Sequence, residues 1–330
     1  MARTRRNRIG TCERGDRDLM GTQRGIALIS ILLIVVLFSA LAFHLYSHQS
    51  MVTAQTRVGL SANQARYSLM ASEALAQELL YMDWLDEDGR IRDDMAEPWS
   101  QPLAPIRTVS GDVRVQIVDL SGKMNLNALA GGSSKESTKA LSYILNRIGI
   151  SMELTPVWRD WIDTDDQRFQ IDGYQGREEL DWLGNDTPFR TPNRLASHLT
   201  EIQVLASFEP EVYSELTQLV TVLPTNSLKI NVNTAHPEVL NSLLPASGSK
   251  MSARGGVRNF GSVEAFVDLH GGFSEVRDLL SVRSDFFEVR ATLDGANLRM
   301  DMTSQIFRDP MSGECRIYAR DFGTRHVWEG

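Results

Sequence analysis

The feature that most constrains this chain is an uncharged apolar stretch close to its N-terminus. From Ile26 to Tyr46 there are 21 residues without a single Asp, Glu, Lys or Arg. At about 1.5 Å of rise per helical residue, this stretch spans about 30 Å, which is the thickness of the hydrocarbon core of a bilayer. The sequence therefore predicts a membrane-spanning helix over residues 26-46.

The segment before this stretch is basic, and the segment after it is acidic. Residues 1-25 carry a net charge of about +4, whereas the whole chain carries −8. Basic flanks of a spanning helix stay on the cytoplasmic side of the membrane, so we expect a cytoplasmic N-terminus and a large acidic domain across the membrane. Proteins that bind nucleic acids present a basic face, and we expect no nucleic-acid partner.

The order of these features resembles a type IV prepilin leader: basic residues, a glycine, and then about 20 apolar residues. A secretory signal peptide would instead place its cleavage site after a shorter apolar core. The resemblance implies that a prepilin peptidase removes residues 1-25 by cutting between Gly25 and Ile26. Both Met1 and Met20 are open as the true start, because a start at Met20 leaves a short leader of the kind common in this family.

The fifth residue after the predicted cut is Ser30, where major pilins carry Glu. This departure resembles the protein K subunit of the general (type II) secretion pathway, a minor pseudopilin that usually lacks this Glu. A carboxylate inside a bilayer costs about 2.5 to 3.5 kcal/mol on insertion scales. A subunit at the tip of a fibre has no neighbour above it whose N-terminal amine could pair with the carboxylate, so it can omit the charge.

The predicted spanning helix continues without a break. Residues 47-85 contain no Pro, and their apolar residues recur at spacings that fit one face of a helix. We expect an amphipathic extension to about Leu85, ended near Gly89.

Alternating polar and apolar residues predict strands at 112-118, 287-293, 298-307 and 315-320. The intervening residues predict short helices at 135-150, 156-162, 193-205, 210-219, 237-244, 262-269 and 274-280. The sequence Asp119-Leu120-Ser121-Gly122-Lys123, followed by Met124-Asn125-Leu126-Asn127, is similar to the junction between pilin fold and helical insert in protein K subunits.

The expected fold is therefore α+β, a pilin-like fold in which the long N-terminal helix packs on an antiparallel sheet. Residues 86-125 and 283-330 would form the pilin-like β-domain. Residues 126-282 would form an inserted, mostly α-helical domain that resembles a sterile-alpha-motif (SAM-like) domain.

An acidic loop near residue 165 is the sharpest candidate for a metal site. Oxygen ligands on a glycine-containing loop suit calcium, which takes six to eight oxygens in flexible geometry. The loop is not an EF-hand, because Arg168 and Tyr174 occupy the positions that need Gly and Glu. A solvated acidic surface is the alternative. The resemblance to protein K subunits implies calcium, with these candidate ligands: Asp163, Asp165, Asp166, Asp172, Glu178 and Glu179.

The segment Ile230-Asn231-Val232-Asn233-Thr234-Ala235 resembles the opening of helix-hairpin-helix DNA-binding modules. The Gly-apolar-Gly turn of those modules does not follow it. We expect Asn231 and Asn233 to cap and brace the helix that starts near Pro237. Among enzyme signatures, there is no His-Glu-x-x-His helix, no Gly-x-Ser-x-Gly elbow and no phosphate-binding loop, so we expect a protein that is not an enzyme.

The resemblance implies a minor pseudopilin of a type II secretion system, anchored by a single pass in a Gram-negative inner membrane, with its C-terminal domain in the periplasm. It would sit at the pseudopilus tip and initiate or cap assembly for protein export across the outer membrane. Its implied partners are minor pseudopilins I, J and H, the prepilin peptidase and inner-membrane lipid. A membrane-anchored DNA-uptake protein is the alternative, and a metal-dependent enzyme is a third and weaker one. The secreted substrates and the residues that touch each partner are open.

Overall fold

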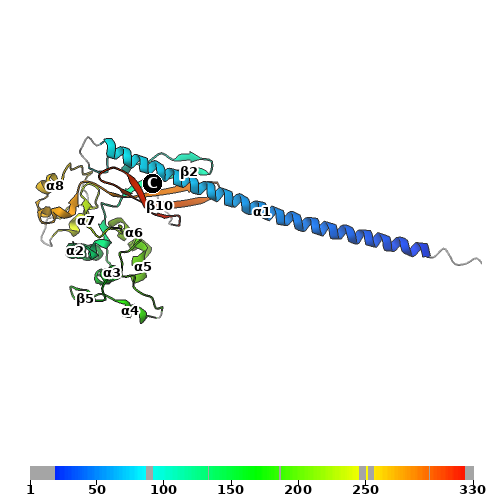
Figure 1. Cartoon of the computed structure of the whole chain (residues 1–330), viewed down its shortest axis with the longest axis horizontal. Coiled ribbons are helices and arrows are strands. Elements are labelled where there is room, and N and C mark those ends of the chain that lie inside the picture. The colour runs from blue at the N-terminus through cyan, green and yellow to red at the C-terminus, as the bar shows by residue number, and fades with distance from the viewer. Residues whose placement is uncertain are drawn as a thin grey trace, which may run out of the picture. The chain divides into compact units, whose positions relative to one another are not determined.

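The computed structural model describes residues 19-86, 92-132, 134-185, 187-244, 250-251, 256-296 and 298-323, with the side chains of 19-25 left out. Most of the leader, Met1 included, therefore lies outside the described residues. The chain divides into two compact units, residues 1-63 and residues 64-330. Each unit is described by itself below (Figure 1).

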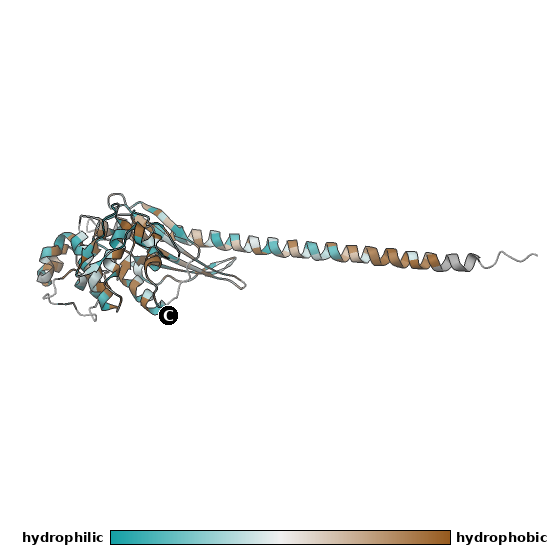
Figure 2. Ribbon diagram, turned by 90° about the horizontal axis from the view of Figure 1, so that it is seen from below, coloured by the Kyte–Doolittle hydropathy of each residue, from teal (hydrophilic) through white to brown (hydrophobic). Residues whose placement is uncertain are grey.

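One uninterrupted helix, α1 (Leu19–Asp86), contains both the predicted span and its predicted extension. Its apolar side chains from Ile26 to Tyr46 are exposed, and Figure 2 shows this part of the helix as predominantly hydrophobic. Among the described residues, this is the one helix whose length and composition would allow it to cross a membrane. An apolar helix with nothing packed on it is consistent with a membrane anchor.

The second unit holds a five-stranded antiparallel sheet in the order β1-β2-β9-β10-β11. The strands are β1 (Ile106–Thr108), β2 (Gly111–Asp119), β9 (Phe286–Asp294), β10 (Arg299–Arg308) and β11 (Cys315–Asp321). The four strands predicted from alternation are present, whereas the three-residue β1 was not expected.

The end of α1 packs on one face of this sheet, as predicted. Ala65, Leu69, Ala76 and Leu80 of the helix share a core with the inward-facing residues of β2, β9 and β10. Arg320 of β11 also donates to the buried carboxylate of Glu73 over 2.6 Å. Burial of this apolar face stabilises the helix at about 25 cal/mol per Å².

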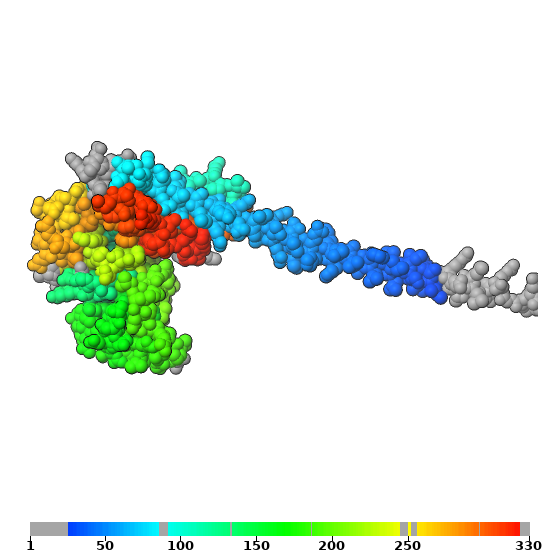
Figure 3. Space-filling view, viewed as in Figure 1, coloured from blue at the N-terminus to red at the C-terminus, as the bar shows by residue number. Residues whose placement is uncertain are grey.

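The chain between β2 and β9 forms a mostly helical insert with its own core. Figure 3 shows α3 (Leu154–Ile162), α4 (Glu179–Leu183) and α5 (Ile202–Leu205), all in green, gathered in one lobe. A short 3-10 helix, η1 (Pro98–Ser100), precedes the sheet. The described helices of the insert are η2 (Leu126–Ala130), α2 (Ser134–Arg147), α3 (Leu154–Ile162), α4 (Glu179–Leu183), η3 (Leu199–Glu201), α5 (Ile202–Leu205), α6 (Pro210–Leu219), α7 (Pro237–Ser242), α8 (Val263–Leu269) and η4 (Gly271–Leu279).

Two of the helix predictions were wrong in part. Of the helix predicted over 193-205, only residues 199-205 are helical, and Asn193 itself has a positive φ of 44°, which lies outside the α-helical region. The helix predicted over 274-280 is instead the 3-10 helix η4.

The insert is built from two repeats that the sequence analysis missed. In each, a Lys-apolar-Asn-apolar-Asn segment forms a short strand that pairs in parallel with a later strand. In the first repeat β3 (Met124–Asn125) pairs with β6 (Val220–Thr221), and in the second β7 (Ile230–Asn231) pairs with β8 (Leu280–Ser281). The lysine before each first strand donates to a carbonyl near the end of the helix that leads into the second strand. Whether either repeat is SAM-like stays a prediction.

Candidate functional site

The acidic loop connects the end of α3 to the start of α4. Helix α3 is anchored by Trp158, which is fully buried and donates its Nε1–H to the carbonyl of Leu126 over 3.1 Å. The loop turns back through a small hairpin of β4 (Gln170–Ile171) and β5 (Tyr174–Gln175). This return brings Asp163, directly after α3, close to Glu178, directly before α4.

Three carboxylates converge at this point. Asp163, Asp165 and Glu178 each place one carboxylate oxygen within 4.8 Å of those of the other two. The side chain of Glu178 is buried, and neither of its oxygens has a hydrogen-bond partner among the described residues. The same is true of Asp163 Oδ1. Buried polar atoms without a partner are rare in folded proteins and call for an explanation.

The electrostatics of the group favour a bound cation. Burial, followed by the negative charges of Asp160 and Asp163, raises the pKa of Glu178 to about 7. Burial and then the charge of Asp165 raise the pKa of Asp163 to about 6. A bound cation would neutralise the repulsion between these carboxylates, and it would give the unpartnered oxygens a partner. Carboxylate oxygens are the ligands that calcium prefers.

Asp160 is a further member of this site that the sequence analysis did not select. Its side chain is buried and accepts the backbone N–H of Phe169 over 3.0 Å, and burial raises its pKa to about 7. The loop passes so close that a Cβ on Gly176 would lie 2.0 Å from Asp160 Oδ2. The usable signal was the spacing of Asp160 and Asp163, which is one turn along the end of a helix.

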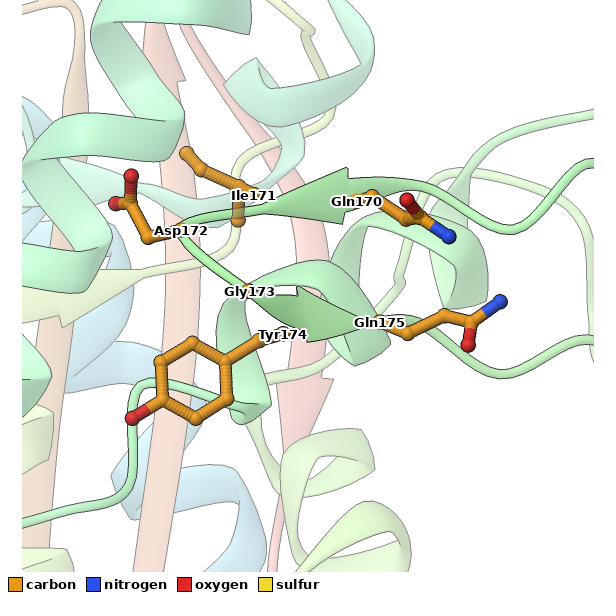
Figure 4. A pocket seen from close by; sticks show the side chains of 6 residues that line it. All are labelled: Gln170, Ile171, Asp172, Gly173, Tyr174 and Gln175. Carbon is orange, nitrogen blue, oxygen red and sulfur yellow. The ribbon is translucent and has the colours of Figure 1, made fainter.

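The structure does not bring the other three predicted ligands into the three-carboxylate group. Asp172 lies at the tip of the hairpin with a φ of 50° (Figure 4). Glu179 forms an ion pair with Arg190 at 3.3 Å. Asp166 is near enough to contribute to the raised pKa of Glu178 but is not one of the converging carboxylates.

The capping role predicted for the two asparagines near residue 232 was wrong. The N-cap of α7 is His236, whose Nδ1 accepts the N–H of Glu238 over 3.2 Å. Asn231 and Asn233 are both buried. Asn233 instead holds the backbone of Phe260 through hydrogen bonds at its amide oxygen and nitrogen.

A buried polar cluster lies where the insert joins the sheet. Asp119, at the end of β2, accepts hydrogen bonds from Ser121 N, Ser284 Oγ and Thr234 Oγ1, and burial raises its pKa to about 6. Beside it, Arg308 pairs with the fully buried Asp93 and with Asp83. These contacts join residues on both sides of the insert.

Near the predicted processing site, Ser30 donates its hydroxyl to the carbonyl of Ile26, one turn earlier, over 3.0 Å. The hydroxyl is thus satisfied within its own helix. The side chain of Ile26 is exposed, and Gly25 is part of the helical backbone of α1. The cleavage itself stays a prediction.

Comparisons with known proteins agree on one family. The family model of protein K of the type II secretion system matches residues 122-225, a range that contains the first repeat of the insert. A type II secretion system protein K of Pseudomonas aeruginosa is 27% identical over 316 residues, covering 91% of this chain and 93% of the relative. The corresponding protein of Klebsiella pneumoniae is 29% identical over 245 residues, covering 70% and 73%.

The fold is likewise similar to a solved one. A chain in the crystal structure of the GspK–GspI–GspJ complex from the type 2 secretion system of enterotoxigenic Escherichia coli superposes with a TM-score of 0.69. The match covers 82% of this chain and 100% of the solved one, at 22% identity. At that identity, the likeness supports the α+β fold with a long helix on an antiparallel sheet.

Proposed function

We propose that this chain, which belongs to the type II secretion system protein K family, is a minor pseudopilin at the tip of the pseudopilus. There it would initiate or cap assembly of the fibre that drives protein export across the outer membrane. The observation that carries this proposal is helix α1, whose N-terminal part exposes apolar side chains and whose C-terminal part packs on one face of the sheet. A fibre subunit needs such a helix for storage in the membrane and for packing against its neighbours.

The insert supports the position at the tip. A domain of about 150 residues (126-282) stands between β2 and β9, and a bulk of this size would crowd a helical fibre made of smaller subunits. Ser30 supports the same position, because it offers no carboxylate to a neighbour above. We expect a structural role with no catalytic step.

The proposed partners are minor pseudopilins I and J, aided by H. The solved structure to which this fold is similar holds GspK together with GspI and GspJ. The prepilin peptidase would cut between Gly25 and Ile26. The mature protein would then sit in the inner-membrane lipid of a Gram-negative cell, with its N-terminus facing the cytoplasm and its head in the periplasm.

Calcium is the proposed ligand of Asp163, Asp165 and Glu178. The unpartnered buried oxygens of Glu178 and Asp163 support a cation there. Asp160 would fix the position of the loop by accepting the backbone N–H of Phe169. The DNA-uptake alternative has less support, because the amide groups of Asn231 and Asn233 are buried and engaged within the protein.

Copurification tests the proposal. The full chain, produced with minor pseudopilins I, J and H in a cell that has the prepilin peptidase, should purify with I and J and begin at Ile26. A chain that is processed but never copurifies with I or J would contradict the proposed role.

A further inference from the structure

We infer that Asn231 is a positioning residue that fixes the orientation of the helical insert on the pilin-like body. Its side chain is fully buried. Its Nδ2 donates to the carbonyl of Asp93 over 3.0 Å and to Ser284 Oγ over 2.8 Å. Asp93 precedes the sheet and Ser284 follows the insert, so one side chain of the insert holds two segments of the body.

The backbone around Asn231 makes further contacts across the same junction. The N–H of Asn231 donates to the carbonyl of Ser121 over 3.0 Å. Thr234 donates its hydroxyl to Asp119 at the end of β2. The insert is therefore joined to the body by a network rather than by two covalent linkers alone.

Hydrogen bonds within the pilin-like body hold the two acceptors of Asn231, Ser284 and Asp93, in place. Ser284 donates its hydroxyl to Asp119 over 2.6 Å, and its N–H donates to Asp93 Oδ2 over 2.7 Å. Asp93 is held in turn by Arg308. Because buried polar networks rigidify a structure when every member is satisfied, the insert and the body should move as one head.

The first repeat of the insert provides a matched comparison. Asn125 stands in the same Lys-apolar-Asn-apolar-Asn context and is equally buried. Its Nδ2 donates to the carbonyls of Thr225 and Ser227 over 2.7 and 3.1 Å. Asn125 directly precedes the insert, and these partners lie within the first repeat rather than in the body segments around Asp93 and Ser284. Asn125 therefore stabilises the first repeat without contacting the two segments that Asn231 holds.

This difference defines the experiment. Spin labels are placed at two exposed positions, Val109 in the body and Leu180 in the insert. They are attached to cysteines in the full chain in detergent, with Cys12 and Cys315 replaced by Ser. Pulsed electron paramagnetic resonance then measures the distribution of distances between the labels, and the melting temperature is measured in parallel.

Asn231→Ala should broaden the distance distribution, and Asn125→Ala should lower the melting temperature with the distribution unchanged. Asn231→Asp keeps the shape and the acceptor oxygen but loses both N–H donors, so it should broaden the distribution as well. If the Asn231 variants lower the melting temperature but leave the distribution as narrow as in the parent, Asn231 only fills the core and the inference is wrong.

A glycine pair keeps the test valid if the asparagine variants fail to fold. A Cβ on Gly122 would lie 2.7 Å from Thr234 Oγ1, whereas a Cβ on Gly132 meets nothing within 4 Å. Gly122→Ala should therefore broaden the distribution, and Gly132→Ala should not. Equal distributions in these two variants would also overturn the inference. A consequence for secretion rests on the proposed function, whereas the distance measurement does not, so the two can fail separately.

Discussion

Replacing Glu178 by Gln should stabilise the proposed periplasmic domain when calcium is absent and remove most of the stabilisation that calcium provides. The substitution keeps the shape of the side chain and removes one of three carboxylates that converge within 4.8 Å. At this separation and an effective dielectric constant of 20, each pair of charges repels by about 3 kcal/mol. Because the pKa of Glu178 is raised to about 7, part of that repulsion is already relieved by protonation at neutral pH.

Without calcium, Glu178→Gln should therefore raise the free energy of unfolding by about 1 to 2 kcal/mol. With calcium at 100 times its dissociation constant, the parent should gain about 2.7 kcal/mol by mass action. At about 2 to 4 °C per kcal/mol, this gain corresponds to a rise of about 5 to 11 °C in melting temperature. The variant should lose most of this rise, because it lacks one charged ligand.

The assay is thermal unfolding of the full chain in detergent, with a calcium chelator and then with calcium. Glu179→Gln is the matched control, since Glu179 is adjacent in sequence but pairs with Arg190 outside the group. It should keep the calcium response of the parent. A Glu178→Gln variant that is less stable than the parent without calcium, and that responds to calcium equally, would refute the reasoning.

Three further predictions concern pH, the buried ion pair and processing. Without calcium, the free energy of unfolding should fall as pH rises from 5 to 8. Asp160 and Glu178 have pKa values of about 7 in the folded protein and lower ones when unfolded, so the folded state binds more protons in this window. A free energy of unfolding, measured with denaturant, that does not change between pH 5 and 8 would count against this prediction. Arg308→Ala should lower the free energy of unfolding by about 3 to 5 kcal/mol, because it leaves Asp93 buried without its partner. Arg316→Ala, which breaks an exposed ion pair, should leave the same measurement nearly unchanged. Gly25→Val should block processing, and mass spectrometry that still finds a mature protein starting at Ile26 would contradict the proposed cleavage.

The long helix and the sheet were predictable because each depends on a pattern that is local in sequence. A run from Ile26 to Tyr46 without charge has few structures open to it, and residues 287-293 alternate in the way that one buried sheet face requires. The three-residue β1 has too few positions to show such alternation. The two parallel pairs of the insert were missed because each strand has only two residues and its partner lies far along the chain.

The candidate site was predictable in composition but not in membership. The sequence showed many carboxylates between residues 160 and 180, yet the choice among them depends on how the hairpin turns. That turn carries Asp172 to its tip and leaves Glu178 facing Asp163. The role of Asn231 was predicted wrongly for a related reason, since its partners Asp93 and Ser284 are 138 and 53 residues away in sequence.

The most direct test of the proposed position is the location of the protein on assembled pseudopili. A single gold particle can be attached to a cysteine introduced at the exposed Leu180, in a chain without its native cysteines, and the fibres imaged by electron microscopy. The account predicts one particle at one end of each fibre. Particles spaced along the length of the fibres would contradict a role at the tip.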